Sequence, residues 1–241
     1  MIKFGTPHRH LAQCGSTNDL ARDWARDLND PAPSGALVTA EFQTQGRGQR
    51  GRQWSAGFGQ SALMSFVYHL PNGAEASQLG LVVALAVAEA IAEVTGVNPR
   101  IKWPNDVLLD GKKAAGILIE AAPGQETGGE AILGIGINVN QDRFVGAEEF
   151  VYPPTSLKIA AGREIEVQTV IASVSRSLSS WEERWRQEGF LSVLEKCRDR
   201  LAVGVTVRQG ETRAELIGLA ASGAAQVQLA DGTFDEWTTV D

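Results

Sequence analysis

The chain has 241 residues, which is enough for one large domain or for one domain with a small second one. Its net charge of −7 and sequence pI of about 5.1 argue against a general binder of nucleic acid or membrane surfaces, but they leave room for a local basic site. The two cysteines, Cys14 and Cys197, stand outside any CxxC pattern, which excludes a disulfide framework and a structural zinc site built on paired cysteines. Because the N-terminus also lacks the apolar run of a signal peptide, we expect a soluble cytoplasmic protein.

The first predicted element is a helix that begins near residue 16. Ser16 or Thr17 can cap it, and Leu20, Trp24 and Leu28 follow at the four-residue spacing of a buried stripe. Capping alone would explain the polar residues at the start of this helix.

A strand predicted over residues 36–42 leads into a segment rich in glycine and arginine, residues 46–54. The glycines leave the backbone free to adopt positive φ and to approach a ligand closely. The arginines bring planar charged groups suited to phosphate and carboxylate. The backbone N–H groups of such a loop can hold a nucleotide phosphate, but the same composition also suits a flexible arm for nucleic acid or a solvated basic loop. The residues concerned are Gly46, Arg47, Gly48, Arg50, Gly51 and Arg52.

The next two elements are a strand over residues 62–70 and a long apolar helix over residues 77–95, separated by a turn at 71–73. The helix is apolar almost all round, which predicts a central, buried helix. Its length, together with Glu89 and Glu93, argues against a membrane span.

A strand with an internal break follows over residues 101–109. Pro104 cannot donate to a sheet ladder, so we expect a bulge or an edge there that re-aims the side chains of Lys102 and Asn105. The Asp-Gly pair that follows predicts a hairpin turn and a return strand over residues 112–120. A strand lysine is usually a solvated outward residue, but a lysine beside tryptophan and proline in an apolar strand is a candidate functional residue.

A further strand over residues 130–140 places Gly134 and Gly136 on one face. Two missing side chains on one face create a groove in which a flat ligand can lie against the backbone. Close packing of the buried helix against the sheet would explain the same pattern, so both interpretations stay open.

The sequence from residue 167 onward predicts two helices followed by a series of short strands. An amphipathic helix over residues 167–188 and a shorter helix with Phe190, Leu191, Leu194, Cys197 and Leu201 in phase predict core-facing stripes. Short strands follow, which predict a small antiparallel barrel or sandwich and domains over residues 1–200 and 201–241. These predicted strands cover residues 203–208, 213–219, 225–230 and 234–240.

Several motifs occur together and in a fixed order. They are Ser-Thr-Asn-Asp (16–19), Gly-Arg-Gly-Gln-Arg-Gly-Arg-Gln-Trp (46–54), Lys-Trp-Pro-Asn-Asp (102–106), Gly-Ile-Leu-Ile-Glu (116–120) and Gly-Ile-Gly-Ile-Asn (134–138). In these motifs the chain resembles the biotin–protein ligases, or biotin–[acetyl-CoA-carboxylase] ligases, over nearly its whole length. The resemblance implies an α/β (α+β) catalytic domain related to class II aminoacyl-tRNA synthetases, followed by a small SH3-like β-barrel. It also implies a ligase that forms biotinoyl-5′-AMP from biotin and ATP and transfers biotin to a lysine of the biotin carboxyl carrier protein of acetyl-CoA carboxylase.

The resemblance further implies roles for individual residues. Lys102 and Arg47 match the residues expected to be catalytic, and Ser16, Thr17 and Gln43 match residues that hydrogen-bond the ureido ring. The matched biotin-binding residues are Ser16, Thr17, Asn18, Gln43, Gly46, Arg47, Gly48, Gln49, Trp54, Lys102, Gly116, Gly134 and Gly136. The matched ATP-binding residues are Arg47, Arg50, Arg52, Trp54, Lys102, Asn105, Lys113 and Asn138. Mg²⁺ is expected to be carried by the ATP phosphates, with no metal ligand from the protein.

Gln49 departs from the family pattern, because the commonest loop is Gly-Arg-Gly-Arg and the second arginine is replaced here. Glutamine keeps hydrogen bonding but lacks the charge, which is a difference of about 1–2 kcal/mol. We therefore predict that a Gln49→Arg variant releases biotinoyl-AMP more slowly than the wild type, measured as the rate at which bound intermediate escapes. A release rate no slower than that of the wild type would count against this prediction.

Two alternative functions are weighed against this interpretation. A lipoate ligase or octanoyltransferase on the same fold carries a histidine-containing signature, whereas the three histidines of this chain lie outside the glycine–arginine segment. A nucleic-acid-binding module would need basic residues around the C-terminal strands, where acidic residues outnumber Arg208 and Arg213. Because only fifteen residues precede Ser16, we expect no helix-turn-helix domain and no sequence-specific DNA binding. Ligases of this type often pair through sheet edges, which leaves a homodimer open.

Overall fold

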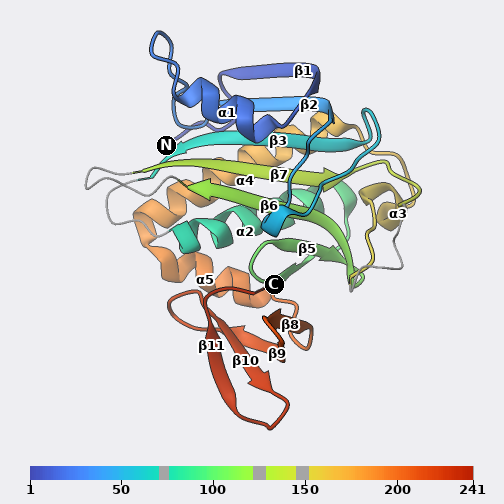
Figure 1. Ribbon diagram of the computed structural model, residues 1–241, viewed down its shortest axis with the longest axis vertical. Helices are drawn as coiled ribbons and strands as arrows, with labels where there is room; N and C mark the ends of the chain where they lie inside the picture. Colours follow the sequence, from blue (N-terminus) through green and yellow to red (C-terminus); the bar gives the residue numbers. More distant parts are fainter. Residues whose placement is uncertain (71–75, 122–128, 145–151, 241) are drawn as a thin grey trace.

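A seven-stranded sheet forms the larger part of the computed structural model, which describes residues 1–70, 76–121, 129–144 and 152–240 (Figure 1). The strand order is β1-β2-β3-β7-β6-β5-β4. Strands β1 and β2 run parallel, and each other neighbouring pair is antiparallel. The strands are His8–Cys14 (β1), Leu37–Gln43 (β2), Ser61–His69 (β3), Arg100–Lys102 (β4), Asp106–Leu109 (β5), Lys112–Ala121 (β6) and Glu130–Asn138 (β7).

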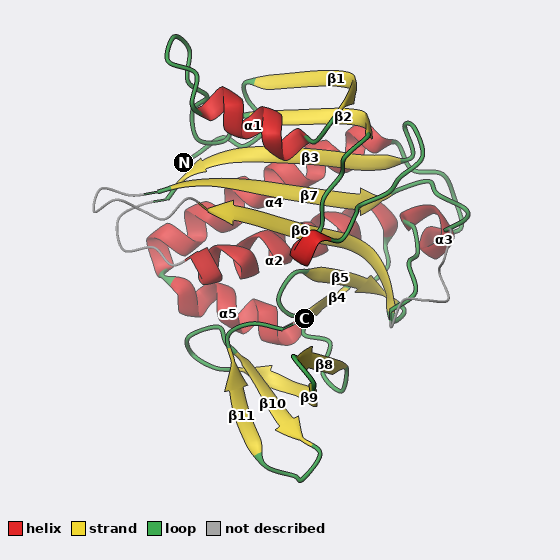
Figure 2. Ribbon diagram, in the orientation of Figure 1, coloured by secondary structure: helices red, strands yellow, loops and turns green. Residues whose placement is uncertain are grey.

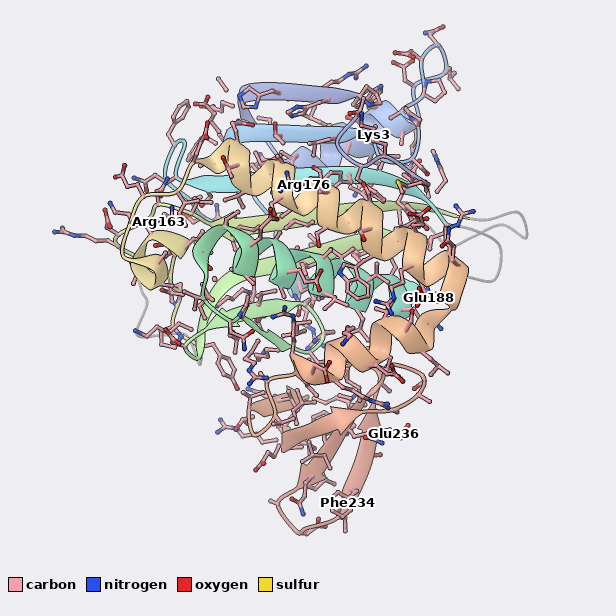
Figure 3. The ribbon with its side chains drawn as sticks, turned by 180° about the vertical axis from the view of Figure 1, so that it is seen from behind. Lys3, Arg163, Arg176, Glu188, Phe234 and Glu236 are labelled. Carbon is pink, nitrogen blue, oxygen red and sulfur yellow. The ribbon has the colours of Figure 1, made fainter. Side chains whose placement is uncertain are left out.

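The helices α2 (Ala76–Thr95), α4 (Val167–Glu188) and α5 (Phe190–Asp199) lie on one side of this sheet (Figures 2 and 3). Helix α2 packs between the sheet and α4, and its apolar side chains are almost completely buried. By length and composition its segment Gln78–Thr95 would suffice to cross a membrane, but 61% of that segment is buried inside the protein, as is typical of a core helix. Its two carboxylates, Glu89 and Glu93, accept hydrogen bonds from side chains of α4. The prediction of a central buried helix is therefore confirmed.

Helix α1 (Thr17–Ala25) lies on the opposite face of the sheet (Figure 1). Ala21 and Trp24 pack on apolar side chains of β2, β3 and β7. The prediction that Leu28 belongs to the same buried stripe is wrong, because Leu28 is 98% exposed. The helix has already ended there, and the Asp27 carboxylate accepts hydrogen bonds from the backbone N–H groups of Asn29 and Asp30.

The C-terminal residues form a separate four-stranded antiparallel sheet in the order β11-β10-β9-β8. Its strands are Thr206–Gln209 (β8), Thr212–Leu219 (β9), Ala225–Leu229 (β10) and Phe234–Trp237 (β11). A mixed α/β sheet followed by a small antiparallel sheet agrees with the predicted fold class. The division into domains at residue 200 stays a prediction.

The predicted elements differ from the structure in a few further places. Neither strand β1 nor helix α3 (Leu157–Ala161) was predicted. Leu191 was assigned to a core-facing stripe, but it is 62% exposed. The turn predicted at 71–73 and most of the segment between β6 and β7 lie outside the described residues.

One buried hydrogen bond ties the C-terminal sheet to the larger one. The indole nitrogen of Trp103, in the turn between β4 and β5, donates to the carbonyl oxygen of Gly223 at 3.0 Å. We predict that Trp103→Phe lowers the free energy of unfolding by about 1–2 kcal/mol more than Trp24→Phe does, measured by denaturant unfolding. Trp24 is the matched control because it is similarly buried and its indole nitrogen has no hydrogen-bond partner within the described part of the chain. If both variants lose the same free energy of unfolding, the Trp103–Gly223 hydrogen bond contributes nothing to stability.

Candidate functional site

A cavity opens on the face of the sheet that carries α1, between that helix, strands β3, β7 and β6, and the glycine–arginine segment. Most of the residues predicted to bind a ligand meet there, although they come from distant parts of the sequence. The cavity is lined by Ser16, Thr17, Asn18, Gln43, Arg47, Gly48, Gln49, Trp54, Met64, Asn105, Lys113, Gly116, Ile117, Leu118, Gly134, Ile135 and Gly136. Five predicted residues are not among these lining residues: Gly46, Arg50, Arg52, Lys102 and Asn138.

The glycine–arginine segment forms a short hairpin rather than an open arm. Its two sides are joined by hydrogen bonds from Trp54 N to Gly46 O and from Gly48 N to Arg52 O. The tip is the 3₁₀ turn η1 (Gln49–Gly51), in which Arg50 adopts a left-handed φ of 57°. Figure 2 shows this turn in front of β6. The hairpin therefore brings Gly48 and Gln49 over the cavity, and we call residues 46–54 the Gly-Arg hairpin.

The wall of the cavity is made by three glycines on neighbouring strands. Gly116 of β6 pairs with Gly136 of β7, and Gly134 lies two residues along on the same face. A Cβ on Gly136 would lie 2.5 Å from Trp54 Cε2, and one on Gly116 would lie 2.9 Å from Trp54 Cζ3. A Cβ on Gly134 would collide with the side chain of Asn18.

These contacts change the interpretation of the glycines. The sequence allowed either an open groove or packing against the buried helix, but the space above Gly134 and Gly136 holds the side chains of Asn18 and Trp54. The absence of side chains at these glycines therefore lets Asn18 and Trp54, which line the cavity, pack against the backbone of the sheet.

A hydrogen-bonded polar cluster closes one end of the cavity. Thr17 donates through its backbone N and its Oγ1 to Gln43 Oε1, at 2.7 and 3.0 Å. The buried Ser65 hydroxyl lies 2.7 Å from Thr17 Oγ1 and 2.5 Å from Asn18 Oδ1. Because the amide oxygen of Gln43 is satisfied within the protein, its NH₂ group remains as the donor for a ligand.

Two lysines and a carboxylate lie beside the row of glycines. Asp106 pairs with Gly116 across β5 and β6, and its Oδ1 is 2.6 Å from Lys113 Nζ. Its other oxygen is 3.5 Å from Lys102 Nζ. Lys113 lines the cavity, whereas Lys102 is buried, is not among the lining residues and lies 4.9 Å from the ring centroid of Tyr152. Burial lowers the pKa of Lys102, and the charge of Asp106 opposes that shift.

A second charged cluster lies where the Gly-Arg hairpin meets α1. The Arg47 guanidinium pairs with both oxygens of Asp19, at 2.7 and 2.6 Å. Arg22 bridges Asp19 and Glu120 at 3.0 and 2.7 Å. The hydrogen bonds from Arg47 hold the pKa of the Asp19 carboxyl below its usual range. Arg47 thus lines the cavity, but its charged end contacts a carboxylate of the protein.

The remaining predicted residues have structural contacts of their own. Asn138 is buried and donates to the carbonyl of Thr155 at 3.0 Å, and Asn105 donates to the carbonyl of Ile117 at 3.1 Å. Within the described ranges no group of three or more His, Cys, Asp or Glu side chains is arranged to hold a metal ion.

Sequence reasoning missed three carboxylates at the site: Asp19, Asp106 and Glu120. Each ends a motif that had been singled out, Ser-Thr-Asn-Asp, Lys-Trp-Pro-Asn-Asp and Gly-Ile-Leu-Ile-Glu. The available signal was that the arginines and lysines singled out at the site need counter-charges where they are partly buried, and these motifs contain the nearby acidic residues.

The comparisons with known proteins agree with this geometry. The sequence pattern of the Biotin/lipoate A/B protein ligase family matches residues 11–138. A biotin–[acetyl-CoA-carboxylase] ligase of Paracoccus denitrificans is 34% identical over 76% of this chain and 76% of its own length. The bifunctional ligase/repressor BirA of Bacillus subtilis is 39% identical over 77% of this chain, which spans 58% of that relative.

A solved structure extends the likeness to the whole fold. A biotin protein ligase from Aquifex aeolicus in complex with biotin and ATP superimposes with a TM-score of 0.82 at 28% identity, covering 97% of this chain and 96% of the other. The family pattern, the similar relatives and this superposition cover the sheet, α1 and the Gly-Arg hairpin that together form the cavity. The chain is therefore a member of the biotin/lipoate protein ligase family, and within it of the biotin–protein ligases.

Proposed function

We propose that this protein joins biotin to ATP and then transfers the biotinoyl group to a lysine of the biotin carboxyl carrier protein of acetyl-CoA carboxylase. The observation that carries the proposal is the polarity of the cavity, which has a neutral hydrogen-bonding cluster at one end and a lysine at the other. Biotin has the same polarity, because its ureido ring is neutral and its valeryl chain ends in a carboxylate. Relatives that carry the name biotin–[acetyl-CoA-carboxylase] ligase support the choice of carrier.

The ureido ring is placed at the cluster of Ser16, Thr17, Asn18 and Gln43. A ureido group has two N–H donors and a carbonyl acceptor, and each needs a partner once it is taken out of water. Hydroxyl and amide side chains provide both kinds of partner. The valeryl chain then runs along the Trp54 ring toward Lys113, which lies 5.9 Å above that ring.

In the first step a carboxylate oxygen of biotin attacks the α-phosphorus of ATP. The new O–P bond forms as the bond to the bridging oxygen breaks, and pyrophosphate leaves with the electron pair. Two anionic groups must approach each other, so fixed positive charge at this point lowers the barrier. Lys113 can provide that charge because it lines the cavity, and Lys102, which contacts the other oxygen of Asp106, is retained as a second proposed source of positive charge.

Mg²⁺ would be held by the ATP phosphates and would neutralise their charge. Asn105, Arg50 and Arg52, together with Asn138, are retained as proposed ATP-side residues, although only Asn105 lines the cavity within the described part of the chain. ATP as a substrate and two free cysteines fit a reaction in the cytoplasm.

In the second step a neutral lysine amine of the carrier attacks the acyl carbon of biotinoyl-AMP. The C–N bond forms, the C–O bond to the phosphate breaks, and AMP leaves with the electron pair while the nitrogen loses a proton. The Gly-Arg hairpin covers the cavity, so it is positioned to keep water away from the mixed anhydride until the carrier arrives.

The proposal is tested by incubating the protein with biotin, MgATP and an apo carrier domain. The expected products are AMP and a carrier that has gained one biotinoyl group on its acceptor lysine, as measured by mass spectrometry. Lipoate and octanoate are the matched controls, because they carry a similar chain and carboxylate without a ureido ring. Efficient transfer of lipoate or octanoate in place of biotin would contradict the proposal and indicate a lipoate ligase or octanoyltransferase.

A further inference from the structure

The Gly-Arg hairpin is held at one point by a network of charged residues that includes no predicted catalytic group except Arg47. Both terminal nitrogens of Arg47 reach Asp19 of α1, at 2.7 and 2.6 Å, and one of them lies 3.5 Å from Glu120 of β6. Arg22 contacts the same two carboxylates. The network contains two positive and two negative charges, so it is balanced.

This network determines which part of Arg47 faces a ligand. The guanidinium is engaged with Asp19, whereas Arg47 and Gly48 both line the cavity. A paired bidentate contact fixes the orientation as well as the position of a guanidinium. The side chain therefore anchors the hairpin to α1 at a point where Arg47 and Gly48 border the cavity.

The same network also orients Asn18. Its Nδ2 donates to Glu120 Oε2 at 2.7 Å, and its Oδ1 receives the Ser65 hydroxyl at 2.5 Å. Asn18 lies against Gly134 and lines the cavity. Glu120 thus contacts two separate parts of the cavity wall, Asn18 and, through Arg47, the Gly-Arg hairpin.

We propose that Asp19 is a positioning residue that holds the Gly-Arg hairpin closed over the bound acyl-adenylate, with Arg22 and Glu120 as its supports. The proposal rests on the proposed function for its ligand, but the anchoring of the hairpin does not require a ligand. The side chains of Asp19 and Arg47 are 41% and 35% exposed, so their ion pair adds little to global stability. Its effect is instead expected in how long the hairpin stays closed.

The test is the variant Asp19→Asn, with Asp23→Asn as the matched control. Asp23 is an exposed residue of the same helix, so the control makes the same charge change away from the hairpin. We expect Asp19→Asn to release preformed biotinoyl-AMP about tenfold faster than the wild type, while its melting temperature changes by no more than about 3 °C. Asp23→Asn should retain the wild-type release rate.

A double variant separates the anchor from a general effect on structure. If Asp19 acts through Arg47, Asp19→Asn combined with Arg47→Met should release the intermediate no faster than Arg47→Met alone. If Asp19→Asn speeds release of the intermediate by the same factor in the Arg47→Met background as in the wild type, the proposal is contradicted.

Hydrogen exchange provides a measurement that needs no ligand. In the free protein, Asp19→Asn should speed amide exchange within residues 46–54, and Asp23→Asn should not. If Asp19→Asn changes neither amide exchange in residues 46–54 nor the release of biotinoyl-AMP, the proposal that Asp19 anchors the Gly-Arg hairpin is wrong. If the wild type formed no adenylate at all, the proposed function would fail, and the exchange comparison would still decide whether Asp19 holds the hairpin.

Discussion

Replacing Lys113 with alanine is expected to slow biotin adenylation by about 100-fold or more while the protein stays folded. The Lys113 ammonium lies at the cavity, 2.6 Å from Asp106 Oδ1, where the biotin carboxylate and the α-phosphate would meet. Without that charge the two anions approach each other less favourably, and Asp106 adds a further negative charge nearby. The measurement is the single-turnover rate of biotinoyl-AMP formation at saturating biotin and MgATP.

The chain offers a control for this variant at the neighbouring position. Lys112 precedes Lys113 on β6, is exposed and points to the opposite face, so Lys112→Ala removes the same charge away from the cavity. It should react at close to the wild-type rate. A different result would assign the stabilising charge to Lys102 instead. In that case Lys113→Ala would form biotinoyl-AMP at a nearly normal rate, and a folded Lys102→Ala variant would form none that can be detected.

The second large effect is expected from adding a single methyl group to the cavity wall. In Gly136→Ala the new Cβ would lie 2.5 Å from Trp54 Cε2, so the indole ring must shift by about 1 Å to restore ordinary contact. Gly136 lies in a central strand that cannot yield easily, and Trp54 therefore moves into the space proposed for the biotin chain. We predict that the Kd for biotin rises about 30- to 100-fold, measured by isothermal titration calorimetry.

Gly80→Ala is the matched control for the same substitution. Gly80 lies within α2, and a Cβ there meets nothing within 4 Å. This variant should bind biotin normally and gain up to about 1 kcal/mol of stability from the better helix former. Wild-type affinity in Gly136→Ala would mean that Trp54 does not border the ligand.

The sequence predicted those parts of the fold that depend on strong local patterns. The apolar helix α2 and the hairpin between β5 and β6 belong to this group, and the Asp110-Gly111 turn has the positive φ values, 49° and 74°, that such a hairpin needs. Strand β1 could not be predicted in this way, because it is a mostly polar edge strand whose order comes from hydrogen bonds to β2. Leu28 lies beyond the end of α1, and Leu191 lies in α5 but is largely exposed, so the sequence spacing did not indicate burial at either position.

The site shows a similar division. The motifs identified most of the cavity-lining residues, because each motif is contiguous in sequence. The alignment of Gly116 with Gly136 and the contact of Arg47 with Asp19 depend on strand register and tertiary packing, which single-sequence patterns do not contain. The same holds for the two lysines that contact Asp106, of which Lys113 lines the cavity and Lys102 does not.

Biotin-dependent exchange of labelled pyrophosphate into ATP tests the central claim most directly, because it reports the adenylation step without any carrier protein. We predict rapid exchange with biotin and Mg²⁺, and none above background with lipoate or octanoate. Exchange that requires lipoate or octanoate, or no exchange with any of the three acids in a well-folded sample, would contradict the assignment of this cavity to biotin adenylation.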